Sequence, residues 1–143
     1  MLLLSLSIII YTLLTIFNIN EFLSFNPLVF LSMVYILPVL INMSIVYFQK
    51  NKTFKILSAM ILPTISSICY SIFAYITLTS GSWEKFVESN SIAKDGFSME
   101  VSSSLFEVNQ VVFMLVVYYG STIIQYFMNK RVANNENGER RYA

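Results

Sequence analysis

The sequence predicts an all-α integral membrane protein in which four transmembrane helices form an antiparallel bundle. Of its 143 residues, 56% are hydrophobic and only 12% are charged, and the mean hydropathy is +0.66. Soluble domains carry about 25% charged residues, so half the usual share is missing. The charges also avoid four blocks, each long enough to cross a hydrocarbon core of about 30 Å, at residues 1–20, 22–49, 56–83 and 108–129.

A soluble bundle would need helices with charged outer faces, because water covers the side that does not pack on the core. The four blocks carry no charge on any face. We therefore expect spans at about residues 2–19, 27–48, 54–79 and 105–128, within a membrane domain of residues 1–128. The first span has no basic residue before it and no small-residue cleavage site, so we expect a retained helix.

Local signals mark the ends of three spans. Asn26 followed by Pro27 is typical of an N-cap and the first helical position. Gly81 is a candidate end for the third span, because glycine accepts the left-handed backbone that terminates many helices. Ser104 and Glu107 have the spacing of a capping box at the start of the fourth span.

The second and third spans each contain a proline within an Ile-Leu-Pro run, at Pro38 and Pro63. In a soluble helix such a proline costs about 3 kcal/mol. In a membrane, neighbouring helices can satisfy the freed carbonyl group, so we expect both prolines to kink their helices and to face the bundle interior. Pro38 shares a broad side with Ser32, Tyr35 and Asn42. Whether the kinks form a hinge or only set the packing stays open.

Polar residues recur on one face of the fourth span when the helix is turned by about 100° per residue. The stripe consists of Glu107, Gln110, Met114, Tyr118, Ser121 and Gln125. We expect it to contact protein, because polar groups without partners are costly in hydrocarbon. Three interpretations are open: hydrogen bonds within the bundle, an interface with a partner, or a path for a substrate.

Two other spans also have distinctive faces. The first span carries a weaker polar stripe of Ser7, Tyr11, Thr15 and Asn18. The third span carries Ala59, Pro63, Ser67 and Ser71 at steps of four residues, with Ala74 nearby. Small residues at this spacing let helices approach closely, so we expect this face to pack against another helix.

Basic residues predict the orientation. Lys50, Lys52 and Lys55 lie between the second and third spans, and a basic tail at 129–143 follows the fourth. Because short basic loops stay in the cytoplasm, we expect both termini there and the more acidic loop 80–104 outside. The lysines could also dock anionic lipid headgroups or an acidic partner. The polar composition of the tail predicts disorder.

The external loop contains the stretch WEKFVE, in which Trp83, Phe86 and Val87 stand among charges. This pattern is typical of a short helix that lies at the membrane interface and is anchored there by aromatic side chains. We expect either a connector with an interfacial anchor or a lid that senses a ligand.

Several kinds of chemistry are excluded by what the sequence lacks. There is no histidine and only one cysteine, Cys69, so we expect neither a histidine-based catalytic site nor a metal site built from these residues. None of the four glycines belongs to a nucleotide-binding motif. Glu107 is the one acid near a span, where it either caps the helix or serves as a functional acid. We expect no catalytic, cofactor or metal site.

These observations favour a non-enzymatic accessory or regulatory subunit of a larger membrane complex, such as an ABC transporter or a sensor system. The alternative is a self-contained homo-oligomeric transporter, pore or bacteriocin-immunity-type protein. In size and number of spans the layout resembles small multi-pass proteins of low-GC Gram-positive bacteria, and the Ile-, Asn- and Lys-rich composition suggests a bacterial source. The expected partners are the lipid bilayer and other membrane subunits or further copies of this chain, without nucleic acid.

Overall fold

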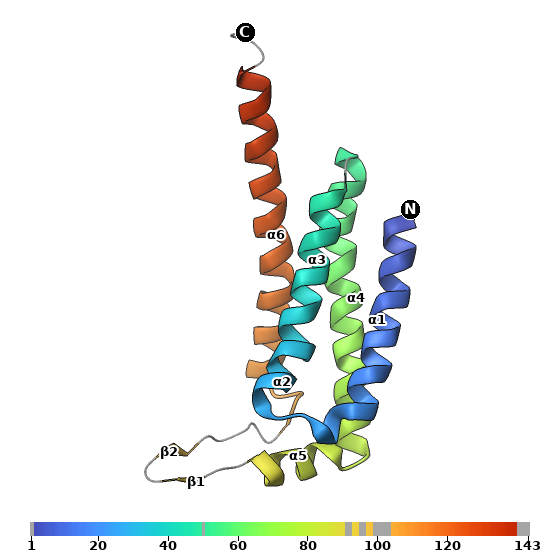
Figure 1. Ribbon diagram of the computed structural model, residues 1–143, viewed down its shortest axis with the longest axis vertical. Coiled ribbons are helices and arrows are strands. Elements are labelled where there is room, and N and C mark those ends of the chain that lie inside the picture. The colour runs from blue at the N-terminus through green and yellow to red at the C-terminus, as the bar shows by residue number, and fades with distance from the viewer. Residues whose placement is uncertain (1, 50, 91–92, 95–96, 99–103, 140–143) are drawn as a thin grey trace.

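The four predicted spans are present as long helices that run side by side (Figure 1). The structure is a computed structural model that describes residues 2–49, 51–90, 93–94, 97–98 and 104–139. α3 and α4 lie between α6 and α1, and the start of α1 and the end of α6 are at the same end of the bundle. The fold is all-α in the sense predicted, with four helices long and apolar enough to cross a membrane.

The first span is α1 (Leu2–Glu21), which continues into a short 3-10 turn, η1 (Phe22–Ser24). The second span consists of α2 (Pro27–Leu31), a π-helical turn η2 (Ser32–Ile36) and α3 (Leu37–Phe48). Its predicted start is confirmed, because the side chain of Asn26 accepts a hydrogen bond of 2.9 Å from the backbone N–H of Val29.

The π turn lies directly before Pro38. In this turn the N–H of Leu37 donates to the carbonyl oxygen of Ser32, five residues earlier. Such turns are common where an α-helix must absorb a local disruption. The extra residue also rotates the chain, which explains why Ser32 is exposed although Tyr35 and Asn42 are buried. Of the three polar residues predicted to share the side of Pro38, Tyr35 and Asn42 therefore do so and Ser32 does not.

The third span is α4 (Lys52–Thr79), which remains one helix through Pro63. It starts two residues earlier than predicted because the side chain of Asn51 caps it, accepting from the N–H groups of Thr53 and Phe54. The predicted end is confirmed: Gly81 follows the helix with a φ of +68°, a conformation that favours glycine.

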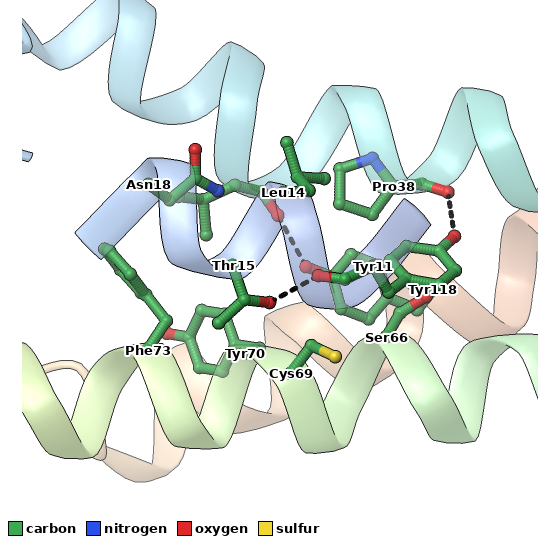
Figure 2. Close-up of a pocket in the computed structure, with 11 residues that line it drawn as sticks. Tyr11, Leu14, Thr15, Asn18, Pro38, Ser66, Cys69, Tyr70, Phe73 and Tyr118 are labelled. Atoms are coloured by element: carbon green, nitrogen blue, oxygen red, sulfur yellow. Dashed lines mark hydrogen bonds between the residues drawn. The ribbon is translucent and has the colours of Figure 1, made fainter. Parts of the chain in front are cut away.

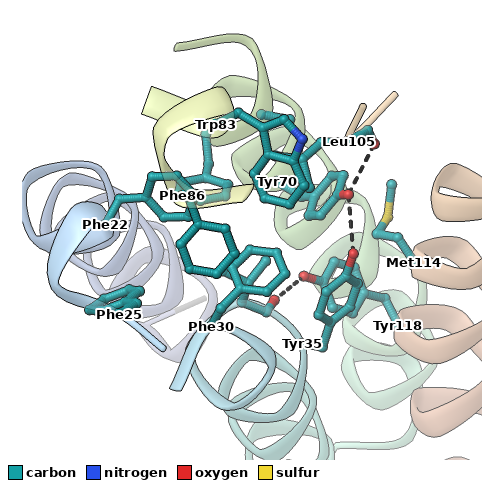
Figure 3. Packing of buried hydrophobic residues seen from close by; sticks show 13 residues of the cluster. Phe22, Phe25, Phe30, Tyr35, Tyr70, Trp83, Phe86, Leu105, Met114 and Tyr118 are labelled. Carbon is teal, nitrogen blue, oxygen red and sulfur yellow. Dashed lines mark hydrogen bonds between the residues drawn. The ribbon is translucent and has the colours of Figure 1, made fainter. Parts of the chain in front are cut away.

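The predicted short helix of the external loop is α5 (Ser82–Asn90), but its aromatic side chains point into the bundle. Trp83 and Phe86 are each only 2% exposed. The ring of Phe86 lies 4.8 Å from that of Phe22 and 5.5 Å from that of Phe30 (Figure 3). The predicted interfacial anchor is thus wrong for these two residues, because aromatic partners from η1, α2 and α4 offer them a packed core.

After α5, two short strands, β1 (Ala93–Lys94) and β2 (Phe97–Ser98), pair in antiparallel fashion. The fourth span follows as α6 (Val108–Glu139). It starts three residues later than predicted. The Ser104 hydroxyl accepts from the N–H of Phe106, and the backbone carbonyl oxygen of Ser104 accepts from the N–H of Glu107. Because α6 begins only at Val108, these residues form a turn before the helix, and Ser104 is not the N-cap that the sequence predicts.

This turn has a structural reason. It buries Leu105, which is 1% exposed, and lets its carbonyl oxygen accept a hydrogen bond of 3.1 Å from Tyr70. At the other end, α6 continues beyond residue 128 to Glu139, where the sequence predicts a disordered tail. A helix that is already nucleated can extend with little further cost, since each added residue gains one hydrogen bond.

Two clusters of buried apolar residues hold the bundle together. The larger one lies toward α5 and is rich in aromatic side chains, including Phe22, Phe30 and Phe86 (Figure 3). The smaller one joins α3 to α4 through Val46 and Leu62. Many aliphatic and aromatic side chains point outward, as expected for surfaces that face lipid rather than water.

Candidate functional site

A network of polar side chains joins three spans at Pro38, near the middle of the second span. The Tyr11 hydroxyl donates to the side-chain oxygen of Asn42 at 2.6 Å and lies 3.0 Å from the carbonyl oxygen of Pro38. The Asn42 amide donates to Ser66 at 3.0 Å. Asn42 is completely buried. The network therefore satisfies a polar residue that would otherwise be costly inside a membrane protein.

A fourth span contributes through Tyr118. Because proline has no N–H, Pro38 cannot bond the carbonyl group of Val34, four residues earlier. The Tyr118 hydroxyl donates to this carbonyl oxygen (Figure 2). A side chain of α6 thus supplies the hydrogen bond that the proline removes from its own helix.

A second group of hydroxyls lies closer to α5. The hydroxyl oxygens of Tyr35 and Tyr70 are 3.2 Å apart (Figure 3). The Tyr35 hydroxyl also donates to the side-chain oxygen of Gln110 at 3.4 Å. Tyr70 in turn donates to the Leu105 carbonyl group. These contacts tie the second span to α4 and to the start of α6.

A cavity of about 20 Å³ lies between these two groups of hydroxyls (Figure 2). It is lined by Tyr11, Leu14, Thr15, Asn18, Val34, Pro38, Ser66, Cys69, Tyr70, Phe73 and Tyr118. Asn18 is 5% exposed, and its side-chain oxygen has no hydrogen-bond partner among the described residues. The cavity is large enough for about one water molecule.

A much larger, open groove of about 800 Å³ lies on the outside, between α4 and α6. Most of its lining is apolar, from residues such as Ile68, Ile72 and Leu115, but Thr64, Ser67 and Ser71 also contribute. Next to it, the hydroxyls of Thr64 and Tyr119 lie 2.8 Å apart and link the two helices.

The predicted stripe of α6 turns toward protein. Met114, Tyr118 and Gln125 are buried, whereas Glu107, Gln110 and Ser121 are half-buried. Its polar members do not meet at one site. Ser121 donates to the Tyr118 carbonyl oxygen of its own helix. Gln125 donates to Asn129, which reaches the carbonyl oxygen of Val46 at 3.4 Å.

The predicted small-residue face of α4 divides into two parts. Ala59, Pro63 and Ala74 are buried in the bundle. Ser67 and Ser71 are half-buried and line the groove, and their hydroxyls donate to carbonyl oxygens of α4 itself, four residues earlier. Pro38 is buried, as predicted.

The lysine cluster is only partly described. Lys50 lies outside the described residues, and Lys52 is the first residue of α4. Lys55 is half-buried in the first turn of that helix. Docking of lipid headgroups or of an acidic partner at this cluster stays a prediction.

The polar stripe predicted on the first span is also turned inward: Ser7, Tyr11 and Asn18 are buried. Ser66, Tyr70 and Cys69 were not expected at a site. Serine, tyrosine and cysteine are common in transmembrane helices, so these residue types alone do not mark a site. The sequence signal that could have identified them is their position, one or two helical turns after Pro63. Among the described residues, no group of three or more His, Cys, Asp or Glu side chains could hold a metal ion.

Comparisons with known proteins add no relative. No protein-family model matches the chain, and neither the curated proteins nor the solved structures contain a match.

Proposed function

We propose that the protein is a non-enzymatic accessory or regulatory subunit of a larger membrane complex, and that a transmembrane helix of the partner occupies the groove between α4 and α6. The observation that carries this proposal is the groove itself, with small hydroxyl side chains on an otherwise apolar, outward-facing surface. We place the protein in the cell membrane with both termini in the cytoplasm, on the basis of its basic loop and tail.

The interior of the bundle supports a structural use of its polar groups. The hydroxyls of Tyr11, Ser66 and Tyr118 donate to groups of neighbouring helices or of their own helix. The cavity among them has room for about one water molecule, which is too little for a transported solute. This favours a role in which the outer surface, rather than the interior, meets a ligand.

The groove has the features that helix association in lipid requires. Lipid tails are as apolar as leucine side chains, so apolar character alone does not drive helices together. Small residues allow close contact between backbones instead. Ser67 and Ser71 are small and direct their hydroxyl protons to their own helix, so they present a surface without an unsatisfied donor.

Affinity purification of the tagged full chain in a mild detergent tests the proposal. We expect a second membrane protein at a fixed ratio with the wild type and with Ser44→Leu, whose serine is exposed on α3 away from the groove. Ser71→Leu fills the groove and should release that partner, with the helical content of the variant unchanged by circular dichroism.

Two results would contradict the proposal. One is recovery of only this chain as a discrete oligomer, which would favour the self-contained transporter, pore or immunity-type protein instead. The other is a partner that stays bound to Ser71→Leu as well as to Ser44→Leu, which would place the interface elsewhere.

A further inference from the structure

The hydroxyls of Thr64 and Tyr119 form a hydrogen bond of 2.8 Å on the outside of the bundle, where α4 and α6 meet. Thr64 is exposed and lines the outer groove, and Tyr119 is half-buried. The bond between the hydroxyls of Tyr35 and Tyr70, by contrast, is buried among the helices. The Thr64–Tyr119 pair therefore presents two polar oxygens at the edge of a groove whose lining is mostly apolar.

The Thr64–Tyr119 pair also lies near the middle of its two spans. Tyr119 is the central residue of the apolar segment Val108–Lys130, and Thr64 is close to the middle of Thr53–Thr79. In the membrane placement proposed above, both hydroxyls are far from water. Polar side chains at this depth almost always face other protein or a water-filled cavity. The exposure of the pair therefore favours a protein surface that covers it.

The direction of the hydrogen bonds limits what that surface can offer. A threonine hydroxyl has one proton and two lone pairs. Thr64 donates its proton to the carbonyl oxygen of Met60 at 2.9 Å. Tyr119 is then the donor in the bond between the two hydroxyls. Both protons are used, so the two oxygens can only accept further hydrogen bonds.

The other hydroxyls in the middle of the groove have the same character. Ser67 donates to the carbonyl oxygen of Pro63, and Ser71 to that of Ser67. Tyr75 also lines the groove, but it follows Thr64 by three turns of α4 and lies near the end of that helix. Among the lining residues, the middle of the groove thus offers side-chain acceptors and no donor.

We propose that the transmembrane helix in the groove carries an uncharged hydrogen-bond donor, a Ser, Thr, Asn or Gln side chain, which donates to the Thr64–Tyr119 pair. This inference rests on the proposed function, because it specifies the chemistry of the helix that the groove holds. A partner acceptor would meet only lone pairs at this level. A lysine or arginine would be costly at this depth, since no acid lines the groove.

Two synthetic transmembrane peptides test the proposal against the full chain in phosphatidylcholine nanodiscs. The peptides are the same leucine- and alanine-rich helix with either asparagine or leucine at the central position. Binding is measured by fluorescence energy transfer. We expect the asparagine peptide to bind the wild type about threefold more tightly, the advantage of an average hydrogen bond between membrane helices.

A double variant with a matched control assigns this preference to the pair. Thr64→Val with Tyr119→Phe removes both oxygens and keeps the side-chain shapes, so the two peptides should bind equally. Thr12→Val with Tyr47→Phe makes the same chemical changes at exposed residues of α1 and α3, away from the groove. This control should keep the preference. Unchanged binding of the leucine peptide shows that the groove of each variant is still folded.

The outcomes separate this proposal from the proposed function. Equal binding of the two peptides to the wild type would overturn the donor, as would a preference that survives the loss of Thr64 and Tyr119 hydroxyls. If Ser71→Leu then still releases the leucine peptide, the groove holds a helix and only its donor is wrong. Failure of both peptides to bind the wild type would contradict the donor and the groove together.

Discussion

The middle of the bundle and its α5 end are held together by different forces. At the α5 end, the rings of Phe22, Phe30 and Phe86 pack against one another (Figure 3). In the middle, Tyr11 and Tyr118 make hydrogen bonds around Pro38 (Figure 2). Ring packing dominates where the bundle meets α5, and hydrogen bonding dominates around Pro38, where the backbone hydrogen bonds of the second span are interrupted.

The largest expected effect lies at the aromatic end. Phe86→Ala removes a buried ring that contacts several others, so it should lower the free energy of unfolding by about 3 kcal/mol. Phe127→Ala is the matched control, because Phe127 is exposed on α6 and should be nearly neutral. Denaturant titration of both variants in the same detergent measures the difference. Equal effects would mean that α5 does not pack on the bundle as described.

A smaller effect is expected in the middle. Tyr118→Phe keeps the ring but leaves the Val34 carbonyl oxygen without its donor, which should cost about 1 to 2 kcal/mol. Tyr75→Phe removes a hydroxyl from an exposed tyrosine of α4 and serves as the control. Unfolding of the two variants followed by circular dichroism provides the comparison. A neutral Tyr118→Phe would show that this bond does not compensate for the proline.

Pro38 and Pro63 provide a sharper comparison within the middle of the bundle. Pro38→Ala restores an N–H that can bond the Val34 carbonyl oxygen and so competes with Tyr118. We expect Pro38→Ala to change the free energy of unfolding by less than about 1 kcal/mol. In the Pro38→Ala background, Tyr118→Phe should then cost less stability than it does in the wild type. Pro63→Ala should leave the Tyr118→Phe loss unchanged. Strict additivity at Pro38 in a double-mutant cycle would argue against the proposed compensation.

The smallest effect concerns orientation rather than stability. With Cys69 replaced by serine, a single cysteine at Asn51 should react with a membrane-impermeant thiol reagent only after the cell membrane is opened. A cysteine at Glu84 on α5, which is exposed, should react in intact cells. The reverse pattern would place the termini outside and refute the orientation predicted from the basic residues.

Local sequence accounts for the elements themselves. The uncharged blocks predict all four spans, and Asn26 and Gly81 mark two of their ends correctly. These features are predictable because a membrane span must be long and uncharged, and because caps act on backbone groups within a few residues. The inward faces of α1 and α6 follow for a similar reason, since polar side chains avoid lipid.

The tertiary structure decides which groups meet. Only the position of α6 beside the second span brings Tyr118 to the carbonyl group that Pro38 leaves free. Only the fold of the α5 end turns Trp83 and Phe86 inward and delays the start of α6 so that Leu105 can pack. Lipid makes long apolar helices compulsory for any such chain, whereas contacts between residues tens of positions apart depend on how the helices assemble.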